Sequence, residues 1–410
     1  MNRRRVVVTG MGLRSPLGSS PDAMMAALLA GKSAIVRMPD WDHIENLRTG
    51  VAGLCPEEVE AEELPRKFRR SMGRVALLAA LATRDAVADS GLDPSRVASD
   101  ACGVSYGSTA GSSSALEGFL RQVFDQQSLL GMQSSTYLKF MSHTCAANVA
   151  LMFGTKGPLI ASCTACTSGS QGVGFGYEAI VLGRSEIMLC GGAEEMHFMD
   201  AGIFDIMRAT STRYNDEPEK TPRPFDASRD GLVVGEGAGS LVLEEFEHAR
   251  ARGARIHAEV LGYGTNCNGV HLTNSCPEGI EGAIRRALKD AGVRPSDVDY
   301  INAHATATDT GDVAEAQATR GIFGDRVPIS GIKGGMGHTL GASGAIESII
   351  TIGMMQRGLA VPTLNLEQVD PRCEGLDHIQ GQARTFNMDV VMNNNFAFGG
   401  VNTSLIFGRA

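Results

Sequence analysis

The amino-acid sequence predicts an α/β protein built from two similar βα halves. The first observation is an internal repeat, in which residues 89–97 (Asp-Ser-Gly-Leu-Asp-Pro-Ser-Arg-Val) and residues 290–298 (Asp-Ala-Gly-Val-Arg-Pro-Ser-Asp-Val) are identical at five of nine positions. The second observation is that each copy follows a predicted helix and precedes a short predicted strand. Because strands that alternate with helices favour mostly parallel sheets covered by helices, we expect that architecture in both halves.

The predicted elements follow the same order in the two halves. The helices before the repeats cover residues 75–88 and 280–289, and Gly91 and Gly292 are suited to end them as C-caps, each followed by a proline that prevents continuation. The matching pairs of predicted strands are residues 6–12 with 258–264, 102–106 with 300–303, and 159–163 with 327–333.

This duplication divides the chain into an N-terminal half, residues 1–250, and a C-terminal half, residues 251–410, joined near residues 245–255. Active sites in α/β sheets lie beyond the carboxyl ends of the strands. The residues that directly follow the predicted strands are therefore the candidates for chemistry.

The composition is that of a globular protein and argues against several functional classes. The chain has 410 residues, of which 43% are hydrophobic and 20% charged, and its net charge is -9. An acidic balance argues against general nucleic-acid binding, and no apolar stretch reaches the roughly 18 residues of a membrane span. The nine cysteines are odd in number and scattered, which does not suggest a disulfide framework. We therefore expect a cytoplasmic protein.

Cys166 follows the predicted strand 159–163 and precedes a predicted helix over residues 168–182. At a helix N-terminus, the macrodipole and the free N–H groups favour a thiolate. Cys163 and Cys166 also form a C-x-x-C motif, which leaves a redox pair, half a zinc site or two core cysteines as alternatives.

Two histidines occupy equivalent places in the C-terminal half. His304 follows the predicted strand 298–301, and His338 follows the predicted strand 327–333. Alone, each could be structural, but together they lie at neighbouring strand ends and face Cys166 from the other half. One cysteine and two imidazoles make a set that processes thioesters, with a nucleophile and two donors for an oxyanion.

Three longer segments extend this pattern to a known family. They are Arg-Pro-Phe-Asp-Ala-Ser-Arg-Asp-Gly at 223–231, Gly-Glu-Gly-Ala-Gly at 235–239 and Asn-Asn-Phe-Ala-Phe-Gly-Gly-Val-Asn at 394–402. With the motifs around Cys166, His304 and His338, essentially the whole chain resembles the elongating β-ketoacyl-acyl-carrier-protein (ACP) synthases, types I and II, of the thiolase superfamily. The resemblance implies a thiolase-like fold with the two halves in an αβαβα layered arrangement.

The resemblance also implies a role for each matching residue. Cys166 would accept the acyl chain, His304 and His338 would act on the malonyl thioester, and Lys333 would be the lysine of the site. Asp312 and Glu315 would support that lysine, and Phe398 would be the gating residue whose backbone N–H joins that of Cys166 in an oxyanion hole.

The remaining implied residues would bind the substrates, the carrier or an ion. Thr306 and Thr308 would hold the pantetheine arm, and Ala110 would lie in the acyl pocket. The carrier would dock on Arg66, Lys67 and Arg70, and a small structural cation would lie at Asn302 and Glu347.

The implied reaction is decarboxylative Claisen condensation of acyl-ACP with malonyl-ACP in fatty-acid elongation, carried out by a homodimer without a redox cofactor or catalytic metal. Some motifs depart from the family pattern. The sequence has His-Ala-Thr-Ala-Thr-Asp at 304–309 where the family has His-Gly-Thr-Ser-Thr-Pro, and Asn393 where a serine is usual. These departures leave open a specialised ketosynthase of a polyketide or aryl-polyene pathway.

Two other functions of related folds fit the sequence less well. A non-catalytic chain-length partner of a polyketide synthase lacks the active-site cysteine, whereas this chain has Cys166. A thiolase uses a second cysteine near the C-terminus as a base, and residues 394–402 contain none.

Overall fold

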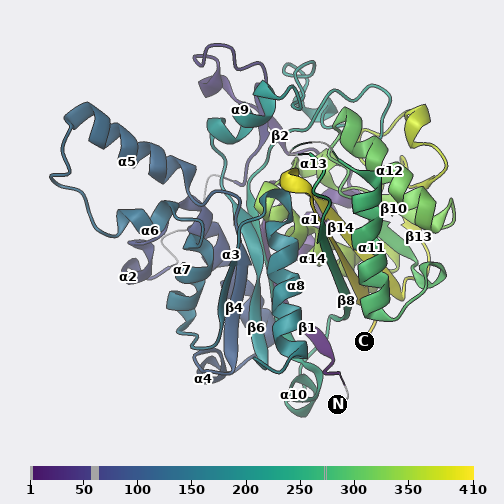
Figure 1. Ribbon diagram of the computed structural model, residues 1–410, viewed down its shortest axis with the longest axis horizontal. Coiled ribbons are helices and arrows are strands. Elements are labelled where there is room, and N and C mark those ends of the chain that lie inside the picture. Colours follow the sequence, from purple (N-terminus) through teal and green to yellow (C-terminus); the bar gives the residue numbers. More distant parts are fainter. Residues whose placement is uncertain (1–2, 57–63, 272, 274) are drawn as a thin grey trace.

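A mixed β-sheet runs through the protein (Figure 1). The computed structural model describes residues 3–56, 64–271, 273 and 275–410. In this part of the chain the sheet has 11 strands, in the order β12-β10-β9-β14-β15-β8-β1-β7-β6-β4-β5. The bounds of these strands are β1 Val6–Arg14, β4 Cys102–Gly107, β5 Leu159–Ser162, β6 Ile187–Glu194, β7 Gly237–Glu245, β8 Ala258–Cys267, β9 Tyr300–Asn302, β10 Pro328–Ser330, β12 Asp377–His378, β14 Val390–Phe396 and β15 Val401–Gly408.

Ten of these strands form two equivalent five-stranded parts, and β12 adds an eleventh strand at the edge beside β10. The order β5-β4-β6-β7-β1 in the first half corresponds strand by strand to β10-β9-β14-β15-β8 in the second. The parts meet where β1 and β8 pair in antiparallel fashion, from Val6 opposite Val260 to Val8 opposite Ala258. The predicted duplication is confirmed. The exact division after residue 250 stays a prediction, and it falls at the end of helix α10 (Phe246–Ala251).

The expectation of mostly parallel sheets was wrong. Strand β4 pairs in parallel with β5 and β6, but β7 is antiparallel to both of its neighbours, β6 and β1. The second half repeats this pattern, with β15 antiparallel to β14 and β8. In the first half, the connection from β6 to β7 over residues 195–236 begins and ends at the same end of the sheet and does not cross back as a βαβ unit would. In the second half, the short segment 397–400 joins β14 directly to β15.

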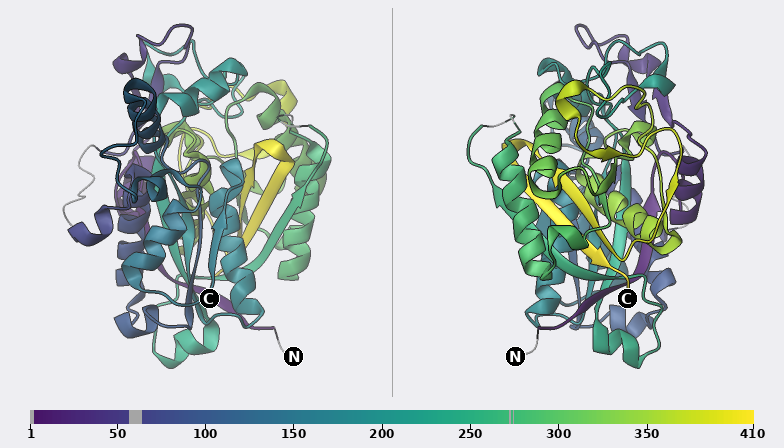
Figure 2. Two further views of the ribbon diagram at one scale, coloured as in Figure 1. Left: turned by 60° about the vertical axis from the view of Figure 1, so that its left-hand side comes forward. Right: turned by 90° about the vertical axis from the view of Figure 1, so that its right-hand side faces the viewer.

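Helices form three layers around the two parts of the sheet (Figures 1 and 2). Helices α8 and α14 share a buried apolar cluster with both parts, α3 and α7 cover the outer face of the first, and α11 and α12 cover the outer face of the second. This is the expected αβαβα arrangement. The helix bounds are α1 Pro21–Leu29, α2 Arg66–Arg69, α3 Arg74–Ser90, α4 Pro94–Val97, α5 Ser113–Gln126, α6 Thr136–Phe140, α7 Thr144–Phe153, α8 Ser168–Val181, α9 Phe198–Ile206, α11 Pro277–Ala291, α12 Asp309–Phe323, α13 Lys333–Met336 and α14 Ser343–Arg357.

Helices α3 and α11 end at the glycines that the sequence predicted as their C-caps. Gly91 ends α3 and Gly292 ends α11, and both adopt the left-handed conformation, with φ of 62° and 68°. Glycine reaches this conformation without the steric cost of a Cβ. Short strand pairs β2 (Ile35–Arg37) with β3 (Val51–Gly53) and β11 (Leu359–Ala360) with β13 (Arg384–Thr385) complete the fold. Within the described ranges, none of the helices has the length and apolar character needed to cross a bilayer.

The carboxyl ends of β5, β9, β10 and β14 bring the candidate residues of the two halves together. The middle-layer helices allow this because they begin close to one another. A Cβ at Gly169, in the first turn of α8, would lie 2.7 Å from the carbonyl oxygen of Gly341, just before α14. Only a glycine at position 169 permits this approach, which places Cys166 of the first half beside the loops of the second.

Candidate active site

Cys166 lies in a tight turn between β5 and α8. Residues Ala165–Thr167 form a single 3₁₀ turn, and α8 follows from Ser168. Ala165 has a φ of 49°, in the left-handed region. The hydroxyl of Ser168 accepts the N–H of Thr164 at 2.9 Å and donates to the carbonyl of Ala165 at 2.7 Å, which holds the turn in this conformation. Cys166 therefore lies two residues before the first residue of α8, in the turn between strand and helix that the sequence predicted.

Burial changes the acidity that was expected for this cysteine. Cys166 is only 5% exposed, and burial raises the pKa of its thiol to about 12, although the charge of Lys333 acts in the opposite direction. The N-terminus of α8 favours a thiolate, but desolvation of the charged form is the larger effect here. The resting group is therefore a thiol, and its reaction as a nucleophile requires a base.

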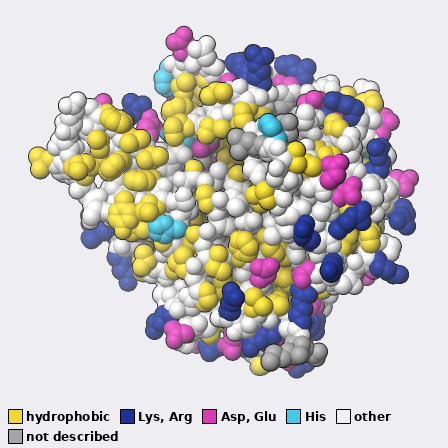
Figure 3. Space-filling model, viewed as in Figure 1, with side chains coloured by type: hydrophobic (Ala, Val, Ile, Leu, Met, Phe, Trp, Pro, Cys, Tyr) yellow, Lys and Arg dark blue, Asp and Glu magenta, His cyan; other side chains and the backbone are white. Residues whose placement is uncertain are grey.

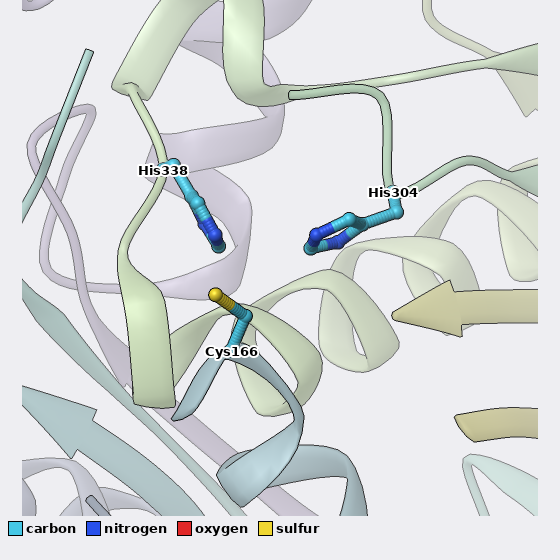
Figure 4. A group of neighbouring side chains, drawn as sticks. All are labelled: Cys166, His304 and His338. Atoms are coloured by element: carbon cyan, nitrogen blue, oxygen red, sulfur yellow. The ribbon is translucent and has the colours of Figure 1, made fainter. Parts of the chain in front are cut away.

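His304 and His338 provide two candidate bases or donors next to the sulfur. One ring nitrogen of each histidine and the sulfur of Cys166 all lie within 4.8 Å of one another. Figure 4 shows both rings pointing toward the sulfur from loops of the second half. The rings are nearly perpendicular, at 86°, with centroids 5.1 Å apart. Burial, with the charge of Lys333, holds the pKa of both imidazoles well below the usual value of 6.5, so both are neutral at pH 7.

The partners of the two Nδ1 atoms distinguish the histidines. Nδ1 of His304 lies 3.3 Å from Nζ of Lys333 and 3.4 Å from Nδ2 of Asn395. Both neighbours are donors only, so Nδ1 accepts and the proton of the neutral ring is on Nε2. Nδ1 of His338 lies 2.9 Å from the hydroxyl of Ser343, which can donate or accept. Nε2 of His338 has no hydrogen-bond partner among the described residues.

Lys333 is buried with no solvent exposure and pairs with Glu347. Glu347 also accepts a hydrogen bond from Nδ2 of Asn395 at 2.6 Å. Burial raises the pKa of Glu347, and the Lys333 ammonium opposes that rise. The resemblance assigned the support of Lys333 to Asp312 and Glu315, but neither hydrogen-bonds to it. Its carboxylate partner is Glu347.

Asp312 and Glu315 instead hold the backbone of the loop that carries His304. Glu315 accepts the N–H groups of His304 at 2.8 Å and Ala305 at 2.7 Å, and Asp312 accepts the N–H of Ala307 at 3.0 Å. The two alanines have φ of 40° and 66°, which is strained for a residue with a Cβ. Burial raises the pKa of Asp312 to about 6 and that of Glu315 to about 8. Carboxylates inside α12 thus fix the conformation of this loop.

The cation site expected at Asn302 and Glu347 does not fit these contacts. The side-chain oxygen of Asn302 is buried without a partner in the described chain, which would suit a cation. However, both oxygens of Glu347 are engaged by Lys333 and Asn395. The oxygen of Asn393 already accepts from Asn302 at 2.9 Å. A hard cation takes about six oxygen ligands, and the ammonium beside Glu347 would repel it.

A cavity leads from the surface to Cys166 and the two histidines. Thr306 and Thr308 line it, with their hydroxyl oxygens 3.0 Å apart. Phe398, in a 3₁₀ turn after β14, also lines it, and its ring packs on Phe204 of α9 with centroids 5.4 Å apart. The predicted threonine and phenylalanine positions therefore border the same space as the sulfur.

Two other sets of predicted residues lie outside that cavity. Ala110 follows β4 in an exposed loop and does not line the cavity of the single chain, in contrast to its expected place in the acyl pocket. The reason is that this loop faces outward, next to the arm formed by α5 and α6. Arg66, Lys67 and Arg70 are exposed at α2, so their charges are accessible.

Several contributing residues were not found from the sequence. Glu347 was assigned to a cation and not to Lys333, and Asn395, Ser343 and Phe204 were assigned no role. One signal could have pointed to Asn395. Residues 393–395 are three consecutive asparagines at the end of a strand that is otherwise apolar, and buried polar groups require partners.

The alternative chemistries of the cysteine motif fit the geometry less well. Cys163 is exposed, and its sulfur donates to the carbonyl of Thr109 at 3.1 Å, whereas Cys166 is buried against the histidines. One sulfur and two imidazole nitrogens could ligate zinc. The nearby Lys333 ammonium and the raised pKa of the thiol both oppose a bound cation. A thiol beside two neutral imidazoles suits acyl transfer better.

Comparisons with known proteins agree with this geometry. Residues 3–249 match the family model described as "Beta-ketoacyl synthase, N-terminal domain", and residues 257–367 match "Beta-ketoacyl synthase, C-terminal domain". Similar curated proteins include the "3-oxoacyl-[acyl-carrier-protein] synthase 1" of Haemophilus influenzae, 36% identical over 99% of both chains, and the "3-oxoacyl-[acyl-carrier-protein] synthase 2" of Vibrio cholerae, 38% identical over 100% of both.

A solved structure shows the same likeness in three dimensions. The crystal structure of a beta-ketoacyl synthase from Burkholderia phymatum superimposes with a TM-score of 0.96, at 50% sequence identity, over 99% of this chain and 100% of that one. The family models, the full-length relatives and this fold agree, and the chain belongs to the β-ketoacyl synthase family.

Proposed function

We propose that this protein is a 3-oxoacyl-ACP synthase, an acyltransferase that elongates fatty acids by condensing acyl-ACP with malonyl-ACP and releasing CO₂. The observation that carries the proposal is the cluster of one buried thiol and two neutral imidazoles within 4.8 Å. Two full-length relatives are named 3-oxoacyl-[acyl-carrier-protein] synthases, which supports carrier-bound acyl groups as substrates. The same relatives favour fatty-acid elongation over the specialised pathways that the sequence left open.

The first half-reaction moves the acyl chain to Cys166. His338 is suited to take the thiol proton on Nε2, because Ser343 can accept a hydrogen bond from Nδ1 of the same ring. The sulfur then attacks the thioester carbonyl, and the backbone N–H groups of Cys166 and Phe398 stabilise the tetrahedral oxyanion. The carrier thiolate leaves as the carbon–sulfur bond to the carrier breaks, and it takes the proton back from His338.

The second half-reaction makes the carbon–carbon bond. Malonyl-ACP loses CO₂, and the electron pair of the broken bond forms an enolate whose negative oxygen needs hydrogen-bond donors. His304 supplies its fixed Nε2–H, and His338 supplies Nε2–H when Ser343 donates to Nδ1. The enolate carbon attacks the acyl group on Cys166, the sulfur leaves as a thiolate when the carbon–sulfur bond breaks, and the thiolate takes one proton from solvent. In this scheme, Lys333 and Glu347 keep His304 in the donor form.

The carrier protein would approach from the side of the exposed basic residues. Arg66, Lys67 and Arg70 present three accessible positive charges in a chain whose net charge is -9. Thr306 and Thr308 line the cavity and would hold the pantetheine arm by their hydroxyl groups. Charges at the rim of an interface mainly increase the rate of encounter.

A second copy of this chain would cover the first half. Strand β5 is one of the two edge strands of the described sheet, and Leu159 on it is exposed. The arm formed by α5 and α6 projects from the body (Figure 1) and carries exposed apolar residues, among them Phe124 at 71% and Leu130 at 86% exposure. Figure 3 shows hydrophobic side chains gathered over this arm. Patches of this kind mark protein interfaces. In such a homodimer, Ala110 would lie near the interface and would border the acyl pocket only there.

We also propose a reducing, cytoplasmic setting. All nine cysteines of the chain lie in its described part and are free thiols, including the exposed Cys163 and Cys267. Exposed thiols persist where glutathione and thioredoxin keep them reduced.

The dimer is expected to have twice the chain mass of 43.3 kDa in sedimentation equilibrium. Phe124→Asp with Leu130→Asp should shift the protein toward the single chain, because two charges would be buried in an apolar interface. The matched control is Leu182→Asp, an exposed apolar position at the far end of α8. A wild-type protein that stays at 43.3 kDa would contradict the homodimer.

Charge reversal of Arg66, Lys67 and Arg70 to Glu should raise the KM for acyl-ACP by about tenfold and reduce its salt dependence. Turnover of a short acyl-pantetheine should change little, because that substrate has no carrier to dock. The control reverses Arg285, Arg286 and Lys289, three exposed basic residues of α11. Equal losses with both substrates would argue against docking at α2.

The two histidines are tested by the release of CO₂ from malonyl-ACP in a Cys166→Gln background, which separates decarboxylation from acyl transfer. His304→Ala and His338→Ala should each lower the rate by about 10²-fold, the usual loss for one oxyanion donor. His43→Ala, at an exposed position, serves as the control. If both active-site variants release CO₂ at the parent rate, the imidazoles have no part in the step.

A further inference from the structure

Asn395 contacts both halves of the active site. Its side-chain oxygen accepts a hydrogen bond from the hydroxyl of Ser170, on α8, at 2.5 Å. Its Nδ2 donates to Glu347 at 2.6 Å and lies 3.4 Å from Nδ1 of His304. This orientation of the amide follows from chemistry, because a carboxylate such as Glu347 can only accept. The donor end of Asn395 therefore faces Glu347 and His304.

These contacts determine which nitrogen of His304 carries its proton. Nδ1 faces two donors, the ammonium of Lys333 and the amide of Asn395. A proton on Nδ1 would point at both donors and would have no acceptor. A neutral ring in this place carries its hydrogen on Nε2, the nitrogen that does not face Lys333 and Asn395.

We propose that Asn395 is a positioning residue that, together with Lys333, fixes His304 as a donor through Nε2–H and connects it to the helix that follows Cys166. The role in decarboxylation rests on the proposed function, whereas the tautomer of His304 does not. An aspartate in this place would present an acceptor to Nδ1 and draw the proton to that nitrogen. Asparagine has the same shape as aspartate, but its amide offers an acceptor to Ser170 and a donor to His304 at the same time.

The packing around Asn395 leaves the amide little freedom to turn. It is fully buried on β14, and a Cβ at Gly344 would lie 2.0 Å from the Ser170 hydroxyl and 2.9 Å from the Asn395 oxygen. Nδ2 of Asn393 is also 3.3 Å from that oxygen. The oxygen is thus enclosed by donors, and a reversed amide would place its NH₂ group against them.

The role predicts different responses for His304 and His338. Of the two active-site histidines, Asn395 contacts His304, whereas the partner of His338 is Ser343. In the proposed mechanism, His304 only donates, during decarboxylation, whereas His338 can also take the thiol proton during acyl transfer. A change at Asn395 should therefore impair decarboxylation and largely spare the acylation of Cys166.

The test compares Asn395→Asp with Asn395→Ala and Ser170→Ala in ¹⁵N-histidine-labelled protein, with His304→Gln used to assign the signal. In the wild type, the signal should show a neutral ring protonated on Nε2. Asn395→Asp should move the proton to Nδ1 and, in a Cys166→Gln background, lower CO₂ release from malonyl-ACP by about 10²-fold. Asn395→Ala and Ser170→Ala should keep the Nε2–H form, since Lys333 still donates, with losses of only a fewfold. Acylation of Cys166 by acyl-ACP should persist in all three.

Three results would overturn the proposal. The first is a wild-type protein in which His304 is protonated on Nδ1. This result does not depend on the folding of any variant. The second is an Asn395→Asp protein that keeps the Nε2–H form and its rate of decarboxylation. The third is an equal loss in the Asp and Ala variants, which would indicate a packing role. If the Cys166→Gln parent releases no CO₂, the proposed function fails instead, and the NMR signal still tests the inference.

Discussion

The buried ammonium of Lys333 is the charge around which the active site is arranged. It has no exposure to solvent, and Glu347 is its charged partner. Removing one member of such a buried pair typically costs about 3–5 kcal/mol, because the other charge is left without compensation. The same ammonium helps to keep both imidazoles neutral, opposes the rise in the pKa of Cys166, and donates toward Nδ1 of His304. One fixed charge therefore influences the protonation of every group that the proposed reaction uses.

The duplicated fold explains how these groups come together from distant parts of the sequence. The first half carries the nucleophile after β5, and the second half carries the imidazoles after β9 and β10. The loops that follow these strands meet at the sulfur of Cys166, and α8 and α14 begin next to one another between the layers. Asp312 and Glu315 of α12 hold the strained loop at Ala305 and Ala307. The position of His304 in the active site therefore depends on a helix of the outer layer. Strain of this kind at a functional site persists only when surrounding contacts determine the conformation.

Much of this arrangement could be predicted from the sequence, and the failures have physical causes. The repeat at residues 89–97 and 290–298 gave the two halves, because helix ends and turns depend on local residues such as Gly91 and Gly292. Strand direction depends on where a long connection returns, and residues 195–236 carry no local sign of it. The partner of Lys333 and the tautomer of His304 depend on contacts between residues far apart in the chain, which spacing cannot reveal. The place of Ala110 in an acyl pocket stays a prediction, because the single chain does not show the surroundings that a second copy would add.

The central claim is that Cys166, and not the neighbouring Cys163, carries the acyl chain. The most direct measurement is peptide mass spectrometry after incubation with acyl-ACP alone, with fragmentation that separates the two cysteines. The proposed mechanism predicts an acyl thioester on Cys166 that is absent from Cys166→Ser and retained in Cys163→Ser. An acyl group found on Cys163, or one that survives in Cys166→Ser, would contradict it.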